Sequence, residues 1–173
     1  MPTPRVRADQ FLRRDGPPLR VMPTHHDRIV VPHRHQFDEL VLVAGGAGVH
    51  RDGGRAYAIA RGDIFLISGD GVHGYQPRPR LHLINILFDP ARLALPWHDA
   101  TALPGWQALF RTAPAARRRG EEARLRLPPA AMREAEGLAG ALARQLAGGR
   151  PGDVLAGVAR FIDLVLFLAR ACD

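Results

Sequence analysis

The sequence contains no lysine and a single cysteine, Cys172. One cysteine excludes an internal disulfide framework, which is the pattern expected of a protein from a reducing cytosol. All 24 basic side chains are therefore arginine, and the formal net charge is +7. The one arginine cluster, at 117–119, is not interleaved with aromatic residues as in a surface that binds single-stranded nucleic acid. We expect a solvated surface loop there, with a contact to nucleic acid as the alternative.

Long apolar runs are also missing. The longest, at 161–169, is interrupted by Asp163 and is far shorter than the roughly 20 residues that a membrane-spanning helix needs. The N-terminus, with Pro4 among several arginines, lacks the apolar stretch of a secretory signal. These absences predict a cytoplasmic protein with no membrane partner. The length of 173 residues and the hydrophobic content of 46% are typical of one globular domain, or of a domain with an appendage.

The hydrophobic pattern divides the chain into four parts. Residues 1–18 are rich in proline and arginine and predict an N-terminal arm. Residues 19–89 contain short strand-like runs about eight to ten residues apart, which predicts an antiparallel barrel or sandwich, with turns at Gly45-Gly46 and at 77–79. Residues 90–127 read as an irregular connector with one short helix, and residues 128–173 as a C-terminal helical pair.

One stretch combines candidate metal ligands with the start of a buried strand. In extended backbone His33 and His35 point to the same face, and Glu39 continues their alternation among apolar residues. A buried carboxylate needs a cation or hydrogen-bond donors. A straight strand would hold Glu39 about 13 Å from His35, so the chain must bend or bulge near Gln36 if the two share an ion. Two imidazoles and a carboxylate suit a zinc, nickel, manganese or iron ion.

A second segment extends this set. Residues 62–67 predict a turn followed by a short buried strand, and His73 comes after the next turn. The order of these residues resembles the two signature motifs of cupin barrels, although Ser68 stands where cupins usually have a proline. In cupins the matching positions bind one metal ion, which implies a ligand set of His33, His35, Glu39 and His73. The alternative is a hydrogen-bonded polar network in the barrel with no metal.

The chain is also similar to the N-terminal sensing half of AraC/XylS-type transcriptional regulators. The segments that carry the likeness are 37–41, 48–50, 62–67, 73–75, 85–88 and 103–110. The resemblance implies a cupin, or jelly-roll, barrel that binds a small polar effector, with a sugar as one candidate, followed by helices that dimerise. It implies that a separate C-terminal domain binds DNA, and we expect that domain to be absent from this chain. The effector is expected to contact Tyr75, His82 and Asn85.

Two other functions are compatible with the same residues. A stand-alone cupin with this ligand set could be a metal-dependent enzyme of the dioxygenase or isomerase type. A sugar- or metal-binding protein with no role in signalling is the second. We expect a sensor that is not an enzyme, because no second acid–base pair is recognisable in the motifs and catalysis does not explain the long helical C-terminus.

The last helix carries two rows of apolar side chains. The first row, from Val154 to Cys172, alternates steps of four and three residues. The second row lies beside it at Leu155, Ile162, Leu166 and Ala169. Because one barrel face cannot cover both rows, the pattern predicts a homodimer through Phe161, Val165 and Leu168. The alternative is that the barrel and the preceding helix cover both rows within one subunit.

Overall fold

The computed structural model describes residues 3–7, 10–12, 15–95, 97–112 and 124–171; Cys172 and the arginine cluster at 117–119 lie outside them. The strands are β1 (Arg5–Val6), β2 (Leu19–His26), β3 (Val30–His35), β4 (Asp38–Asp52), β5 (Arg55–Ala60), β6 (Asp63–Ile67), β7 (His73–Phe88) and β8 (Leu125–Arg126). The helical segments are α1 (Pro90–Leu93), η2 (Ala100–Ala102), α2 (Pro104–Trp106), η3 (Gln107–Thr112), α4 (Pro129–Leu146) and α5 (Asp153–Arg170).

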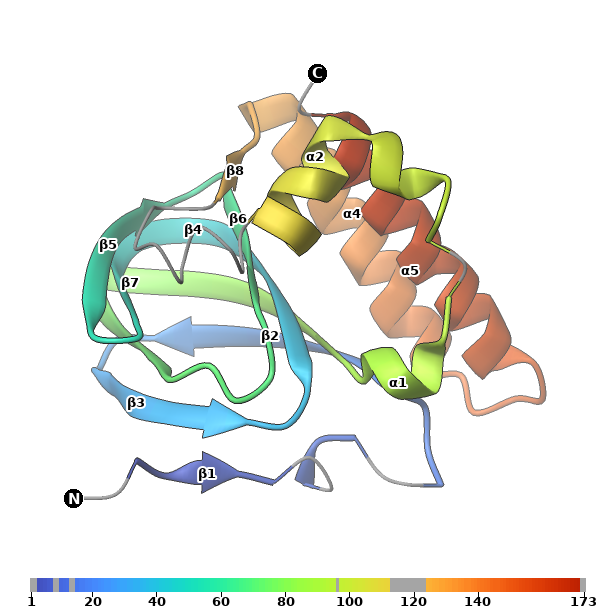
Figure 1. Ribbon diagram of the computed structural model, residues 1–173, viewed down its shortest axis with the longest axis horizontal. Coiled ribbons are helices and arrows are strands. Elements are labelled where there is room, and N and C mark those ends of the chain that lie inside the picture. Colours follow the sequence, from blue (N-terminus) through green and yellow to red (C-terminus); the bar gives the residue numbers. More distant parts are fainter. Residues whose placement is uncertain (1–2, 8–9, 13–14, 96, 113–123, 172–173) are drawn as a thin grey trace.

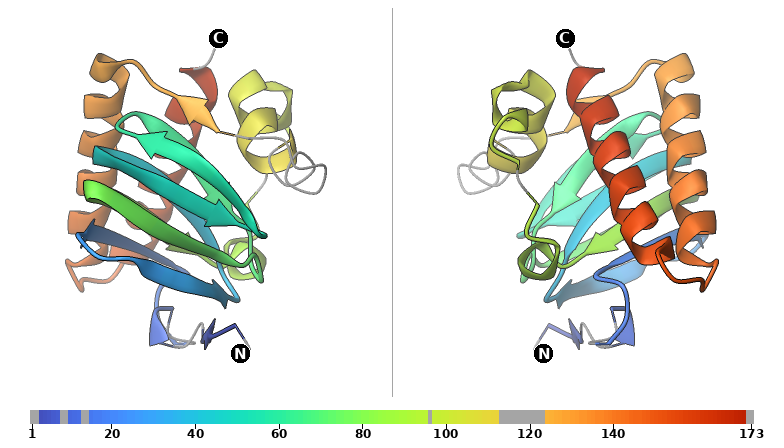
Figure 2. Two further views of the ribbon diagram at one scale, coloured as in Figure 1. Left: turned by 90° about the vertical axis from the view of Figure 1, so that its left-hand side faces the viewer. Right: turned by 90° about the vertical axis from the view of Figure 1, so that its right-hand side faces the viewer.

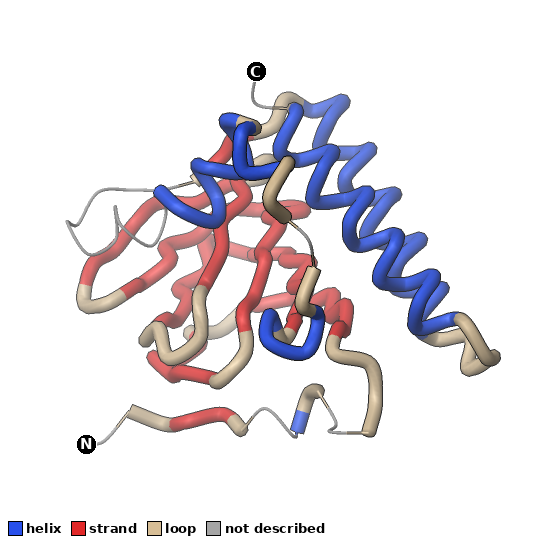
Figure 3. The backbone as a smooth tube through the Cα atoms, turned by 45° about the vertical axis from the view of Figure 1, so that its right-hand side comes forward, coloured by secondary structure: helices blue, strands red, loops and turns tan. Residues whose placement is uncertain are grey.

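The strands form one sheet that curls into a barrel (Figure 1). The strand order is β1-β3-β7-β4-β6-β8, while β2 pairs with β7 and β5 pairs with β4. All pairs are antiparallel except β1 with β3. Figures 2 and 3 show α4 and α5 side by side along one face of this barrel. The predicted cupin barrel followed by C-terminal helices is confirmed.

The central strands are apolar on both faces because each face packs in a different core. Alternate residues point to opposite sides of a strand. One set fills the barrel interior and includes Val41, Val43, Phe65 and Leu83. The other set packs under the helices and includes Leu40, Leu42, Ile64 and Ile86. This arrangement explains why residues 40–43 form an unbroken apolar run.

The turns predicted at Gly45-Gly46 and at 77–79 are wrong, because β4 and β7 continue through them. The register between the two strands shifts on either side of Gly45-Gly46, so these glycines mark bulges in a continuous ladder. At Gly46 the backbone has φ of 71°, and a Cβ atom would lie 1.8 Å from the carbonyl oxygen of Arg80. The strands approach too closely there for any residue with a side chain.

A buried carboxylate joins the barrel to the segment that leads into α4. Asp63, at the start of β6, is fully buried and accepts hydrogen bonds from the backbone of Ala60 at 2.8 Å and from Arg124 at 3.0 Å. The guanidinium of Arg126 lies 3.3 Å from the second carboxylate oxygen. Beside this cluster, Arg61 forms a more exposed ion pair of 2.7 Å with Glu136 of α4.

Three side chains of the first apolar row of α5 belong to the core of the subunit. Phe161, Val165 and Leu168 are 0% exposed, so they cannot form the homodimer interface for which the sequence pattern favoured them. The ring of Phe161 lies 5.1 Å from that of Phe88 in β7, and side chains of α4 complete the same cluster. At the start of α5 both rows are exposed, with Val154 at 43% and Leu155 at 75%, while Ala169 of the second row is buried.

The N-terminal arm touches the barrel at two places. β1 pairs with β3 in the register Val6 to His35, and Leu12 packs in a small cluster with Phe37 and Leu87. Among the helices of the described residues, none is long and apolar enough to cross a membrane.

Candidate functional site

Three of the predicted ligands meet inside the barrel. β3 ends at His35 and β4 begins at Asp38, so the bend that the sequence requires near Gln36 is present. This bend brings Nε2 of His35 to 2.9 Å from Oε2 of Glu39. Nε2 of His73, from the start of β7, lies 3.9 Å from the same oxygen. One candidate ligand atom from each of the three residues lies within 4.8 Å of the others, and all three residues are buried.

His33 lies close to this group without joining it. Its ring centroid is 4.3 Å from that of His73 and 6.3 Å from that of His35. Its Nδ1 atom is 3.0 Å from the carbonyl oxygen of Val31, and the ring is only partly buried. The cluster of ligand atoms therefore contains three of the four predicted residues. The β3–β7 pairing shifts its register just before His33, which changes how this segment meets β7.

Backbone carbonyl groups orient the imidazoles of the cluster. Nδ1 of His35 lies 2.7 Å from the carbonyl oxygen of Phe37, and Nδ1 of His73 lies 3.2 Å from that of Gly71. A carbonyl oxygen only accepts, so each Nδ1 carries a proton and each Nε2 points toward Glu39. Nε2 of His35 and Oε2 of Glu39, 2.9 Å apart, attract only if a proton or a cation lies between them. Metal-binding histidines are commonly oriented in this way, so the group fits a divalent cation.

Burial keeps His73 in the neutral form that metal binding requires. The pKa of His73 is lowered to about 2, first by burial and then by the neighbouring His33 and His35. The pKa of His26 is also lowered by burial, although the charge of Glu39 opposes that shift. Both effects disfavour positive charge on these two imidazoles.

A second polar region lies on the same interior face. In the sheet register, Asn85 of β7 stands opposite both Met22 of β2 and Val41 of β4, and Thr24 stands opposite Leu83. Oδ1 of Asn85 and Oγ1 of Thr24 are buried, and neither has a hydrogen-bond partner among the described residues. Asn85 was expected here. Thr24 was not identified from the sequence, because β2 has no apolar residue after Met22 apart from a proline. The alternation of its inward and outward side chains is visible only in the complete strand.

His50 is an interior residue that the sequence pattern did not assign to one face of its strand. The centroid of its ring lies 4.6 Å from that of Phe65 and 5.1 Å from that of Tyr75, which places Tyr75 inside the barrel. An extra residue in β4 at Ala44 reverses the alternation, so even-numbered positions face inward after this bulge. No signal short of the register itself would have placed His50 here.

His82 lies on the opposite face of β7 from Asn85, so the predicted interior contact is not formed. β7 is continuous, and His82 differs from Tyr75 and Asn85 by an odd number of residues. Its ring lies 4.3 Å from that of His25 across the β2–β7 pair. The expected turn at 77–79 had hidden this alternation.

Residues 20–162 match the family model of the AraC-like ligand binding domain. The chain belongs to this family. The transcriptional activator RhaR of Escherichia coli, described as HTH-type, is 37% identical over 104 residues, which are 60% of this chain and 37% of that protein. The chain thus spans well under half the length of this relative.

The AraC-like ligand binding domain also has solved structural neighbours with low overlap. KdgF from Halomonas sp. has a TM-score of 0.40 and 25% identity over 42% of this chain and 69% of that chain. A cupin superfamily protein from Desulfitobacterium hafniense has a TM-score of 0.39 and 14% identity, over 41% of this chain and 67% of that chain. Scores this low do not bear on function, and the barrel follows from the strands themselves.

The neutral state of His73 predicts that this AraC-like ligand binding domain loses stability in acid. Its pKa is 6.5 in the unfolded chain and about 2 in the folded one, so only the unfolded chain gains this proton as the pH falls below 6.5. The unfolding free energy is therefore not reduced by His73 above pH 6.5. Below pH 6.5 it falls, through His73, by up to about 1.4 kcal/mol per pH unit. We expect His73→Gln to flatten the dependence of the unfolding free energy on pH, measured by urea unfolding with a chelator present.

His98→Gln, at an exposed position of the connector, is the matched control and should retain the wild-type slope. Equal slopes for the wild type and His73→Gln between pH 6.5 and about 4.5 would contradict the assignment.

Proposed function

We propose that this chain is the effector-sensing domain of an AraC-type transcriptional regulator and that a small polar molecule binds inside its barrel. The observation that carries the proposal is the pair of buried oxygens, Asn85 Oδ1 and Thr24 Oγ1, that have no partner among the described residues. An unpaired buried polar group costs about 1–3 kcal/mol, so a ligand that donates hydrogen bonds to these oxygens gains from pairing them. Polyhydroxy compounds such as sugars have suitable donors and are the first class to test.

A sensor is favoured over an enzyme by the acidic groups of the interior. The buried carboxylates of the described chain are those of Glu39 and Asp63. Asp63 is held by arginines at the end of the barrel, which leaves Glu39, in contact with His35, and no second carboxylate for acid–base chemistry. The name of the relative RhaR is that of an activator. In such a regulator, we assign contact with DNA to a separate helix-turn-helix part.

The effector hypothesis predicts ligand-dependent stabilisation that requires Asn85. In a thermal-shift screen of sugars and related metabolites, a ligand at about 100 times its dissociation constant should stabilise the fold by roughly 2.7 kcal/mol. Asn85→Ala and Thr24→Val should each lose most of that shift, because each removes one polar partner. His82→Ala, on the other face of β7, is the control and should retain it. A ligand that stabilises Asn85→Ala as strongly as the wild type does not bind where we propose.

We also propose that His35, Glu39 and His73 hold one divalent ion of zinc, nickel, manganese or iron, with His33 beside it. The support is the convergence of two Nε2 atoms on one carboxylate oxygen, together with the carbonyl groups that orient both rings. When bound, such an ion would act as a Lewis acid and attract an oxygen of the effector. The protein would contribute two buried imidazoles and the carboxylate of Glu39.

Elemental analysis of protein purified without a metal-affinity step tests the metal hypothesis. We expect close to one equivalent in the wild type and almost none in His35→Ala or His73→Ala, since each substitution removes one of only three protein ligands. His25→Ala, outside the cluster, should keep the metal. Unchanged metal content in both cluster variants would show that these histidines serve the fold alone.

The exposed row of α5 is our candidate for the homodimer contact. Leu155 is 75% exposed, and Ile162 and Leu166 are partly exposed on the same side of the helix. Burying a leucine or isoleucine side chain contributes about 1.5–3 kcal/mol, and a helix face of this kind can meet its own copy across a twofold axis. We therefore propose an isologous homodimer through this row in place of the buried row.

Charged substitutions on this row should separate the subunits without unfolding them. We expect sedimentation at micromolar concentration to show a dimer for the wild type and a monomer for the double variant Leu155→Glu, Ile162→Glu. Val31→Glu, at a similarly exposed apolar position of β3, should remain dimeric. A wild-type monomer, or a double variant that still sediments as a dimer, would exclude this interface.

A further inference from the structure

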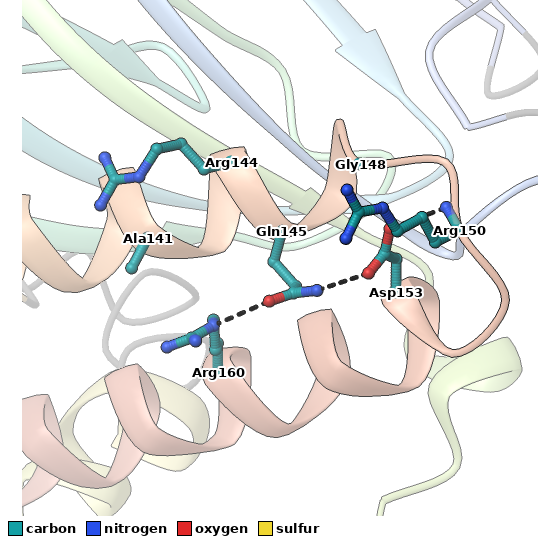
Figure 4. Close-up of a pocket in the computed structure, with 7 residues that line it drawn as sticks. All are labelled: Ala141, Arg144, Gln145, Gly148, Arg150, Asp153 and Arg160. Atoms are coloured by element: carbon teal, nitrogen blue, oxygen red, sulfur yellow. Dashed lines mark hydrogen bonds between the residues drawn. The ribbon is translucent and has the colours of Figure 1, made fainter.

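A hollow of about 340 Å³ lies between α4 and the start of α5, away from the barrel interior (Figure 4). Its lining comes from the C-terminal half of α4, from the connecting loop and from the first turns of α5. The lining residues are Ala141, Arg144, Gln145, Gly148, Arg150, Asp153 and Arg160. Three of these seven residues are arginines and one is acidic, so the hollow has a net charge of +2.

The single carboxylate of the hollow is already engaged. Oδ1 of Asp153 accepts a hydrogen bond of 2.7 Å from the side-chain amide of Gln145. Oδ2 of Asp153 accepts another of 2.7 Å from the backbone N–H of Arg150. Both oxygens are therefore used by groups other than a guanidinium.

The three arginines of the hollow have guanidinium N–H groups that donate to no acceptor among the described residues. Arg160 donates through Nε to Oε1 of Gln145 at 3.4 Å, which leaves its two terminal nitrogens. Within the described parts of the chain, the guanidinium groups of Arg144 and Arg150 have no hydrogen-bond acceptor and no carboxylate partner. A guanidinium group has five N–H donors in a planar fork, and this fork matches the oxygens of a phosphate or carboxylate.

The backbone around the hollow holds this arrangement in place. A Cβ atom at Gly148 would lie 2.2 Å from Oδ2 of Asp153, so only glycine allows the carboxylate to occupy its position. Asp153 orients Gln145, and Gln145 in turn orients Arg160 (Figure 4). The 18-residue helix α5 has no side-chain cap at its N-terminus, so its first amide groups add positive potential nearby.

We propose that this hollow binds a phosphate group, either as inorganic phosphate or as the phosphate of a small metabolite. A phosphate monoester carries about −1.5 to −2 charge at pH 7, which matches the net charge of the lining. The volume is at the lower end of the roughly 300–1,000 Å³ of small-molecule sites. The three arginines line one hollow, whereas a surface for the nucleic-acid backbone would spread them along a stripe.

The site is independent of the effector site in the barrel. It joins the last turn of α4 to the first turns of α5 through the bound anion, and none of its residues faces the barrel interior. A bound phosphate would therefore stabilise the helical hairpin directly. Phosphate would then affect the stability of the domain independently of the small polar molecule in the barrel.

Isothermal titration of the full chain with inorganic phosphate, and in parallel with a sugar phosphate, tests the proposal at constant ionic strength. We expect saturable binding that Arg144→Gln and Arg160→Gln each weaken by about tenfold or more, the loss typical of a charged hydrogen bond. A sugar phosphate that binds at least tenfold more tightly than inorganic phosphate identifies the metabolite as the source.

Two controls separate a built site from general attraction between charges. Arg133→Gln removes an exposed arginine from a similar face of α4, about 16 Å along the helix from Arg144, and should leave the affinity unchanged. Asn85→Ala should also leave it unchanged, whatever that variant does to the effector. The proposal is overturned if phosphate does not bind, if Arg133→Gln weakens binding as much as Arg144→Gln, or if Arg144→Gln and Arg160→Gln have no effect.

Discussion

The ladder between β4 and β7 runs from the pair Asp38–Phe88 to the pair Asp52–His73, almost the full length of both strands. It places side chains in the barrel interior with one face and under the helices with the other. The same ladder positions Glu39, His50, His73 and Asn85. Since its partners are about 20 to 50 residues apart in sequence, the site forms only when the whole barrel does.

The interior has two kinds of polar group, and they lie near each other. Glu39 and the imidazoles offer lone pairs and negative charge, which suits a cation. Asn85 stands opposite Val41, two residues along β4 from Glu39, a separation of roughly 7 Å. In the effector site that we propose, one electrostatic anchor would act together with directional hydrogen bonds.

The sequence predicted the parts of this site that depend on local spacing. His35 and Glu39 are four residues apart, and the need to pair a buried carboxylate was enough to infer the bend between them. Residues whose direction depends on register were missed or misplaced. A one-residue bulge at Ala44 turned His50 inward, and the continuity of β7 turned His82 outward. The two rows of α5 could be counted from the sequence, but which of them met the barrel depended on packing against α4.

The cluster around Asp63 gives the joint between barrel and helices two contacts of unequal strength. Separating a fully buried carboxylate from its arginines costs about 3–5 kcal/mol, whereas an exposed ion pair contributes about 1 kcal/mol or less. Asp63 is fully buried, and the pair of Arg61 with Glu136 is partly exposed to water. The contact through Asp63 therefore resists separation of β6 from the segment before α4 more strongly than the surface pair does.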